Sequence, residues 1–158
     1  MKNLGKTILR YLIAVSVPLL IGTLAALVTG NNFGVYESMA KPVLSPPAWL
    51  FPVAWTILYG LMGVASGLIS DSSAPGRKSA LGLYALQLLV NLFWPIVFFR
   101  LQAPLAALII LLLLLWLVWQ MYRRFQTIDP LAGWLILPYL LWLLFALWLN
   151  LGVWWLNR

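Results

Sequence analysis

Two amide side chains in the third long apolar stretch are the groups best suited to hold a ligand. Gln87 and Asn91 stand four residues apart, so on a helix they share one face. An amide that faced lipid would leave its donors and acceptors unpaired at a cost of several kcal/mol, so we predict that both amides point inward. Such amides can orient a bound ligand, and a hydrogen bond between helices is the alternative role. The two roles can coexist.

Aromatic rings accompany these amides. Tyr84, Trp94 and Phe98 fall on the same helical stripe as the two amides. The tryptophans that lie near convergent polar groups, and that we assign to a ligand pocket, are Trp49, Trp55, Trp94 and Trp142, with Tyr59 one turn after Trp55. The alternative for an aromatic residue is a place in the membrane interface, and we assign to it Trp116, Trp119, Trp134, Trp154 and Trp155. A cavity of rings and amides suits the stacking of a flat apolar molecule, not hydrolysis.

The residues that carry most enzyme chemistry are missing. The chain has no cysteine and no histidine, which removes thiolate chemistry, imidazole bases and nearly all transition-metal sites. Its three acids, Glu37, Asp71 and Asp129, fall in predicted loops, so a carboxylate relay inside a span is not expected. We predict no obligatory cofactor, no metal and no catalytic residue. If the protein is an enzyme, Trp49 and Trp142 are the candidates, with a cofactor-like ligand as the source of the chemistry.

The elements that must position these residues are membrane helices. Of the 158 residues 64% are hydrophobic and 8% are charged, far from the roughly one quarter charged that is typical of soluble domains. Several apolar runs reach the length of about 20 residues that a span needs. We predict an all-α integral membrane bundle that forms one domain over residues 1–158, with five transmembrane helices at about 8–28, 51–70, 80–99, 105–121 and 131–156. The leucine-rich fourth helix has no polar face, so we expect it to be the wall most exposed to lipid.

The connection over residues 29–50 is the longest loop, and we expect it to act as a lid. Pro42, Pro46 and Pro47 each fix φ and push the preceding residue toward extended geometry, so the proline segment cannot coil into a helix before about Leu50. On the helix that follows, small residues such as Gly63 and Gly67 mark either a packing face or the seam of a homodimer.

The ten basic residues predict an orientation in the membrane rather than a nucleic-acid partner. The net charge is +7, but Lys and Arg are scattered singly or in pairs at the ends of the apolar runs. The amino end, the second loop and the fourth loop hold seven of them, and the opposite side holds three. By the positive-inside rule, the amino end lies in the cytoplasm, and the lid and the carboxyl end lie outside, if the membrane is a bacterial cell membrane.

A series of short motifs runs in order along nearly the whole chain. In the first half its residues are Tyr36, Lys41, Pro42, Pro46, Pro47, Trp49, Trp55, Leu58, Tyr59, Met62 and Gly63. It continues with LGLY at residues 81–84, Gln87, Asn91, Trp94, Pro95, Phe98, Phe99, Pro130, Leu131, PYL at residues 138–140, Trp142, Leu149 and Asn150. This series resembles the translocator protein family, also called tryptophan-rich sensory proteins or peripheral benzodiazepine receptors.

The resemblance implies five transmembrane helices around a pocket under the first loop, with porphyrins, sterols and benzodiazepine-like or isoquinoline compounds as ligand classes. It adds two residues, so that the candidate ligand-binding residues are Tyr36, Trp49, Trp55, Tyr59, Gln87, Asn91, Trp94, Phe98, Trp142 and Ala146. Two features depart from the family pattern. Val35 stands where the family has a tryptophan, and Leu151 and Trp155 replace the tyrosine and the base of a cholesterol motif, so sterol binding through that motif is not expected.

We interpret the chain as a membrane receptor or carrier for flat hydrophobic ligands such as porphyrins and other tetrapyrroles. Two other functions stay open. One is an enzyme that degrades porphyrin by light-dependent oxidation at a pocket tryptophan, and the other is a regulatory scaffold that senses a ligand and signals through a partner. The expected partners are a tetrapyrrole or another hydrophobic small molecule and the lipid bilayer.

Overall fold

The computed structural model describes residues 4–30 and 32–158, with side chains described for all of these except residues 32 and 33. The described part is helical and contains no strand. Its elements are α1 (Leu4–Thr29), α2 (Asn32–Ser38), α3 (Leu50–Asp71), α4 (Arg77–Pro95), η1 (Ile96–Arg100), α5 (Pro104–Ile128) and α6 (Pro130–Leu156). Within these residues α1, α3, α4 with η1, α5 and α6 are each long and apolar enough to cross a membrane. The prediction of a five-helix membrane bundle is confirmed.

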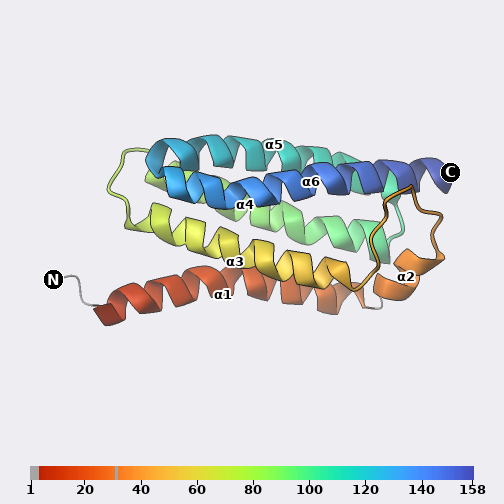
Figure 1. Cartoon of the computed structure of the whole chain (residues 1–158), viewed down its shortest axis with the longest axis horizontal. Coiled ribbons are helices and arrows are strands. Elements are labelled where there is room, and N and C mark those ends of the chain that lie inside the picture. The colour runs from red at the N-terminus through yellow and green to blue at the C-terminus, as the bar shows by residue number, and fades with distance from the viewer. Residues whose placement is uncertain (1–3, 31) are drawn as a thin grey trace.

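The five long helices lie side by side, with α1 on one flank next to α3 (Figure 1). The amino end, the turn between α3 and α4 and the junction of α5 and α6 lie at one end of the bundle. The short helix α2, the segment 39–49 and the carboxyl end lie at the other end (Figure 1). We call α2 and residues 39–49 together the lid. The first residues of α1 and the last residues of α6 therefore lie at opposite ends of the bundle.

The lid is more ordered than the expected loop over residues 29–50. Its first part is the helix α2, which the sequence analysis did not predict. The prolines do keep the following segment out of helix until α3 begins at Leu50, as expected. Helix α2 is only seven residues long and includes Gly34, so its local preference for helix is weak and its packing decides its conformation.

Helix α5 is longer than predicted. The expected end at residue 121 was wrong, because Tyr122, Arg123 and Arg124 continue the helix to Ile128 instead of forming a polar connection. The two arginines are exposed while Phe125 is fully buried, so the last turns carry their charges on the outside. The fall in hydropathy at Tyr122 therefore does not mark the end of this helix. The end is set by Asp129, whose side chain accepts hydrogen bonds from the first backbone N–H groups of α6.

The wall most exposed to lipid is α1, not the leucine-rich helix. The buried residues of α1 are Pro18 and Ala25. Helix α5 packs against both α4 and α6 and buries Ala107, Leu111, Leu114, Leu117, Val118, Met121 and Phe125. In a bilayer a lipid-facing surface and a helix-facing surface are equally apolar, so composition alone does not distinguish them.

Glycines allow α1 to lie against α3. A Cβ atom on Gly63 would overlap the backbone of Val15, and one on Gly67 would lie 2.7 Å from the ring of Tyr11. Gly22 of α1 is in the same way covered by the ring of Tyr59. The small residues of α3 therefore form a packing face within one chain, which is the first of the two interpretations that the sequence left open for them.

Candidate functional site

The main cavity lies between α1, α3 and α4, beneath α2, and has a volume of about 540 Å³. This volume is in the range of pockets that bind small organic molecules, about 300–1,000 Å³. Its lining consists of Leu19, Gly22, Thr23, Ala25, Ala26, Thr29, Gly30, Tyr36, Ala48, Phe51, Pro52, Trp55, Thr56, Tyr59, Asn91, Trp94, Pro95 and Phe99. No charged residue belongs to this set, so the cavity suits an apolar ligand body.

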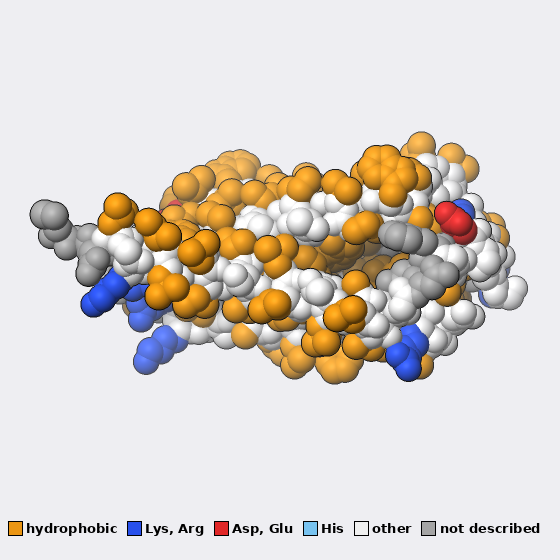
Figure 2. Space-filling model, turned by 90° about the horizontal axis from the view of Figure 1, so that it is seen from below, with side chains coloured by type: hydrophobic (Ala, Val, Ile, Leu, Met, Phe, Trp, Pro, Cys, Tyr) orange, Lys and Arg blue, Asp and Glu red, His pale blue; other side chains and the backbone are white. Residues whose placement is uncertain are grey.

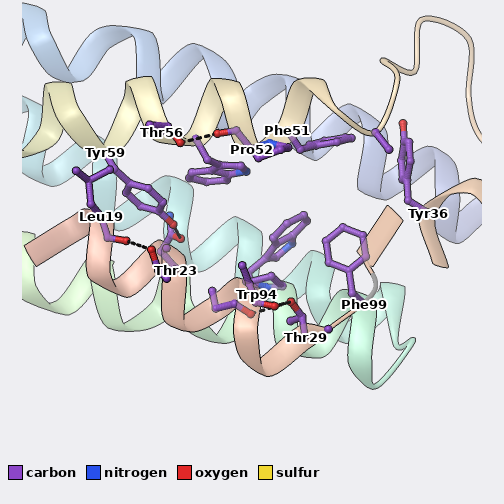
Figure 3. Close-up of a pocket in the computed structure, with 18 residues that line it drawn as sticks. Leu19, Thr23, Thr29, Tyr36, Phe51, Pro52, Thr56, Tyr59, Trp94 and Phe99 are labelled. Atoms are coloured by element: carbon purple, nitrogen blue, oxygen red, sulfur yellow. Dashed lines mark hydrogen bonds between the residues drawn. The ribbon is translucent and has the colours of Figure 1, made fainter. Parts of the chain in front are cut away.

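Two aromatic walls face each other across the cavity (Figure 3). Helix α3 supplies one wall, with Phe51 and Trp55 on either side of Pro52. The opposite wall contains Trp94 of α4 and Phe99 of η1 (Figure 3). Rings that oppose each other across a gap can stack on both faces of a flat molecule.

Proline 95 shapes the second wall. It has no backbone N–H, and directly after it the helix widens into the π-helical segment η1, where the N–H of Leu101 bonds to the carbonyl of Ile96 at 3.0 Å. The helix therefore changes its pitch locally after Pro95. Within η1, Phe99 lines the main cavity at its lid end, and Phe98 lines a smaller cavity beside it.

Tyr36 closes the cavity at the lid. Its hydroxyl donates to the carbonyl of Pro46 at 3.1 Å, and its ring meets the ring of Phe51 edge to face, with centroids 5.0 Å apart. Burial raises the pKa of the Tyr36 hydroxyl above its usual value of 10.0, an effect that a hydrogen bond with Ser45 partly offsets. The group therefore stays a neutral donor that ties α2 to the proline segment.

The lid is also fastened to the carboxyl end of α6. The side-chain amide of Asn157 donates to the carbonyl of Ala40 at 2.8 Å and accepts from the N–H of Ala40 at 3.1 Å. The ring of Pro42 lies where a side chain on Gly152 would be, and the indole of Trp148 donates to the carbonyl of Val43 at 3.4 Å. These contacts hold the lid over the cavity.

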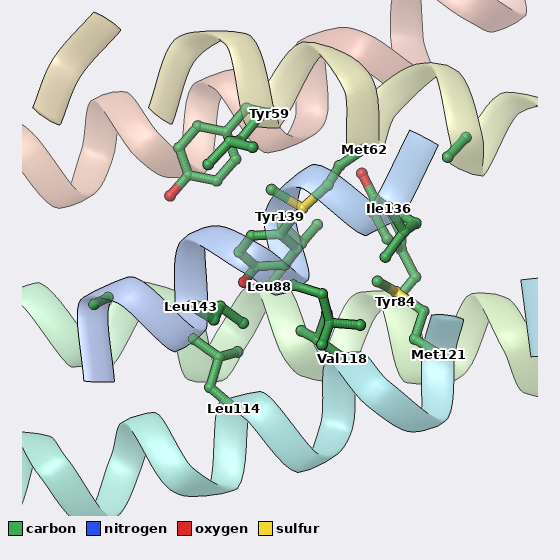
Figure 4. Packing of buried hydrophobic residues seen from close by; sticks show 14 of the residues in the cluster. Tyr59, Met62, Tyr84, Leu88, Leu114, Val118, Met121, Ile136, Tyr139 and Leu143 are labelled. Carbon is green, nitrogen blue, oxygen red and sulfur yellow. The ribbon is translucent and has the colours of Figure 1, made fainter. Parts of the chain in front are cut away.

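The two predicted amides point inward, as expected. Asn91 accepts from the hydroxyl of Tyr59 at 2.8 Å through Oδ1 and donates to the hydroxyl of Tyr139 at 2.7 Å through Nδ2. Tyr139 in turn donates to Oε1 of Gln87 at 3.0 Å. Figure 4 shows Tyr139 at the centre of the packed core, with Tyr59 and Met62 of α3 nearby. These hydrogen bonds join α3, α4 and α6, so Asn91 has the interhelical role, and it also lines the cavity.

Trp94 is held by a residue that the sequence analysis did not assign to the site. Its indole Nε1 donates to Oδ1 of Asn150 at 3.1 Å, and the Asn150 amide donates to the carbonyl of Pro104 at 2.8 Å. The Trp94 ring also stacks on Phe98, with centroids 5.2 Å apart. An asparagine inside an apolar helix is the signal that points to such a role, because a lipid-facing amide would be unpaired.

The structure brings five of the predicted binding residues to the main cavity: Tyr36, Trp55, Tyr59, Asn91 and Trp94. Phe98 and Ala146 line a smaller neighbouring cavity of about 20 Å³, which shares Tyr36, Phe51, Trp94 and Phe99 with the site. Gln87 and Trp142 lie one layer behind, since Gln87 bonds to Tyr139 and the Trp142 ring contacts the rings of Phe51 and Trp55. Trp49 precedes the first turn of α3, is 62% exposed and is not part of either lining.

The contribution of α1 was missed at the sequence level. Gly22 and Ala26 of this helix and Gly30 directly after it recur every four residues and line the cavity, because small side chains leave space there. Thr23 of α1 and Thr56 of α3 line the cavity while being exposed, so the cavity opens between these two helices. Figure 2 shows the hollow on this face of the molecule.

The hydroxyl groups of these two threonines are hydrogen-bonded within their own helices. Thr23 donates to the carbonyl of Leu19 at 2.9 Å, and Thr56 donates to that of Pro52 at 2.7 Å. Each therefore presents an apolar surface to the bilayer. Among the described residues no cluster of His, Cys, Asp or Glu could hold a metal ion. The arrangement can bind and orient a hydrophobic molecule, and it offers no general acid or base.

Comparison with known proteins finds one family model and several similar proteins. The model of the TspO/MBR family matches residues 14–156. The chain is 41% identical to Protein CrtK of Rhodobacter capsulatus over 124 residues, which cover 77% of this chain and 78% of that protein. It is 32% identical to the tryptophan-rich protein TspO of Archaeoglobus fulgidus over 155 residues, 95% and 98% of the two chains. It is 38% identical to the translocator protein of Bos taurus over 145 residues, 89% and 86% of the two chains.

Proposed function

The chain belongs to the TspO/MBR family and is an integral membrane protein, and from this we propose that it is a receptor or carrier that binds a flat hydrophobic ligand of the tetrapyrrole class. The observation that supports the proposal most strongly is the pair of opposed aromatic walls, Phe51 and Trp55 against Trp94 and Phe99, around an uncharged cavity of about 540 Å³. Stacking on both faces selects a flat molecule over a bulky one.

The test is an equilibrium titration of the purified protein in detergent with protoporphyrin. The quenching of tryptophan fluorescence reports how much ligand is bound. The matched variants are Ala26→Trp, which fills the cavity from α1, and Ala106→Trp, which adds the same ring to an exposed position on α5. We expect saturable binding by the wild type and the Ala106→Trp variant, and its loss in the Ala26→Trp variant. Equal binding by all three proteins would place the ligand outside this cavity.

Illumination of the same complex separates a receptor from a porphyrin-degrading enzyme. The cavity offers no acid, base or metal ligand, so a receptor should return the tetrapyrrole with unchanged mass after light exposure, apart from the loss seen with free porphyrin. Mass analysis of the extracted ligand is the measurement. A loss of porphyrin that requires the folded protein and stops when Trp55 or Trp94 is replaced by Phe would favour the enzyme.

The orientation in the membrane is part of the proposal. The end that holds the amino terminus contains Lys6, Arg10, Arg77, Lys78, Arg123 and Arg124, and the lid end contains Lys41, Arg100 and Arg158; Lys2, which the sequence count includes, lies outside the described residues. This excess supports an amino terminus in the cytoplasm of a bacterial cell. Single cysteines at Ser73 and Ser45 should label from opposite sides of intact cells. Labelling of the Ser73→Cys variant from outside the cell, without labelling of the Ser45→Cys variant, would show the opposite orientation.

A further inference from the structure

The main cavity has no charge with which to bind an acid. Its polar lining residues are Thr23, Thr29, Tyr36, Thr56, Tyr59 and Asn91. Both ends of the Asn91 amide are already bonded to tyrosine hydroxyls. An ionised carboxylate inside this space would lose its hydration without gaining a counter-charge, which is strongly unfavourable. The acidic groups of any ligand bound here must therefore lie at an edge of the cavity. We call the edge beside Tyr36 and Phe99, at the lid end, the mouth; it is distinct from the side opening between α1 and α3.

Arg100 stands at that mouth on the η1 side. It directly follows Phe99, which lines the cavity, and its Nη1 donates to the carbonyl of Val28 at 2.7 Å, next to the lining residues Thr29 and Gly30. The guanidinium has five N–H donors, and this hydrogen bond uses one. Its side chain is exposed, so the remaining donors are accessible to a ligand.

Lys41 stands on the lid side of the same mouth. Its ammonium group lies 4.8 Å from the ring centre of Tyr36, a residue that lines both cavities, and donates to the carbonyls of Tyr36 and Glu37 at 3.2 and 3.3 Å. The two cations therefore approach the mouth from η1 and from the lid.

Neither Arg100 nor Lys41 forms an ion pair within the described part of the chain, although Lys41 bonds to the backbone carbonyl of Glu37. Among the described residues the ion pair is that of Arg10 with Asp71, at the opposite end of the bundle. Arg100 and Lys41 instead donate to backbone carbonyls at the ends of α1 and α2. Such carbonyls satisfy the geometry of a cation without cancelling its formal charge, so both side chains keep a positive charge beside the mouth.

We propose that Arg100 and Lys41 bind the carboxylates of the ligand at the mouth of the cavity. The ligand is then an amphipathic acid, with a flat apolar body between the aromatic walls and acidic side chains at the lid end, rather than a neutral sterol. This inference rests on the proposed function, because it assigns the polar end of a molecule whose rings occupy the cavity. Arg100 contributes most, since its planar guanidinium can hold a carboxylate with two hydrogen bonds.

The test compares protoporphyrin, which has two carboxylic acids, with its dimethyl ester, which has the same rings and no acid. Both are titrated into the wild type and the Arg100→Gln, Lys41→Gln and Arg100→Lys variants in an uncharged detergent, which removes lipid headgroups as competitors. We expect Arg100→Gln to weaken binding of the acid about threefold to tenfold and to leave ester binding within twofold. Lys41→Gln should show the same selectivity with a smaller effect, and Arg100→Lys should recover part of the loss.

The control is Arg123→Gln, which removes one positive charge at the opposite end of α5 and should change neither affinity. Equal losses for acid and ester in Arg100→Gln would show a structural role of this residue and overturn the inference, as would unchanged binding of the acid in both glutamine variants. In either case saturable ester binding by the wild type would leave the proposed function intact. If neither compound binds the wild type, the proposed function itself fails.

Discussion

The indole Nε1 of Trp94 donates a hydrogen bond to the side-chain oxygen of Asn150 across 3.1 Å. This bond lets α6, which lies behind the cavity, set the orientation of a ring in its wall. Because Asn150 also donates to the carbonyl of Pro104, it connects the wall to the first turn of α5. The aromatic wall is thus held by a polar group that lies outside the lining of the main cavity.

Replacing Asn150 by Ala should weaken porphyrin binding, although residue 150 does not line the main cavity. The indole loses its partner, so Trp94 gains rotational freedom that the ligand must then restrict. We expect a loss of about threefold to tenfold in affinity, smaller than for Trp94→Ala. Titration with protoporphyrin measures it. The exposed Leu151→Ala variant is the control on the same helix, and an equal loss there would reject a specific role for the Trp94–Asn150 bond.

Trp55 and Trp49 should differ in their effect on ligand binding. Trp55 lines the cavity and contacts the ring of Tyr59 with centroids 5.3 Å apart, whereas Trp49 is 62% exposed. Trp55→Ala should weaken porphyrin binding by about 1 to 3 kcal/mol, and Trp49→Ala by less than about 0.5 kcal/mol. Binding isotherms of the two variants decide this. A larger effect at Trp49 would mean that the ligand sits at the membrane surface beside the lid.

Tyr139→Phe should destabilise the bundle more than a typical tyrosine replacement. The change removes a hydroxyl that accepts from Asn91 and donates to Gln87 and leaves two buried amide groups without that partner. We expect a loss of about 1 to 2 kcal/mol in the free energy of unfolding. Tyr122→Phe is the control, since that half-buried ring stacks on Trp119. Thermal unfolding in detergent compares them, and equal melting temperatures for both variants would show that this network adds no net stability.

Gly63→Val should disturb the contact between α1 and α3, because a Cβ atom at this position would overlap the backbone of Val15, which cannot move aside as a side chain would. Gly60→Val is the matched control, since nothing lies within 4 Å of a Cβ atom at that position. We expect a loss of more than about 2 kcal/mol in Gly63→Val and a change within about 1 kcal/mol in Gly60→Val. Unfolding in detergent measures both. Similar stability of the two variants would mean that α1 is not packed closely on α3.

Several features of the site followed from the sequence because they depend on burial alone. Gln87 and Asn91 had to point inward, since two amides one turn apart cannot be left in lipid. Trp55 and Tyr59 stand one turn apart on α3, and Trp94 lies on the face of α4 that holds the two amides. The sequence assigned all three to a pocket, and the structure brings them to the cavity. The exposure of Trp49 did not follow, because a tryptophan at a helix end suits either a pocket or the membrane interface.

The sequence by itself determined the all-α membrane bundle, the number of spans and the inward face of the third of them, because hydrocarbon forces backbone and amide groups to find partners within the protein. Only the tertiary structure decided which wall faces lipid, where α5 ends and which residues of α1 line the cavity. Apolar surface gains nothing from packing on helix rather than lipid, so these choices depend on the fit between helices. The pairing of Trp94 with Asn150 belongs to this second group, since it joins residues 56 positions apart through the geometry of two packed helices.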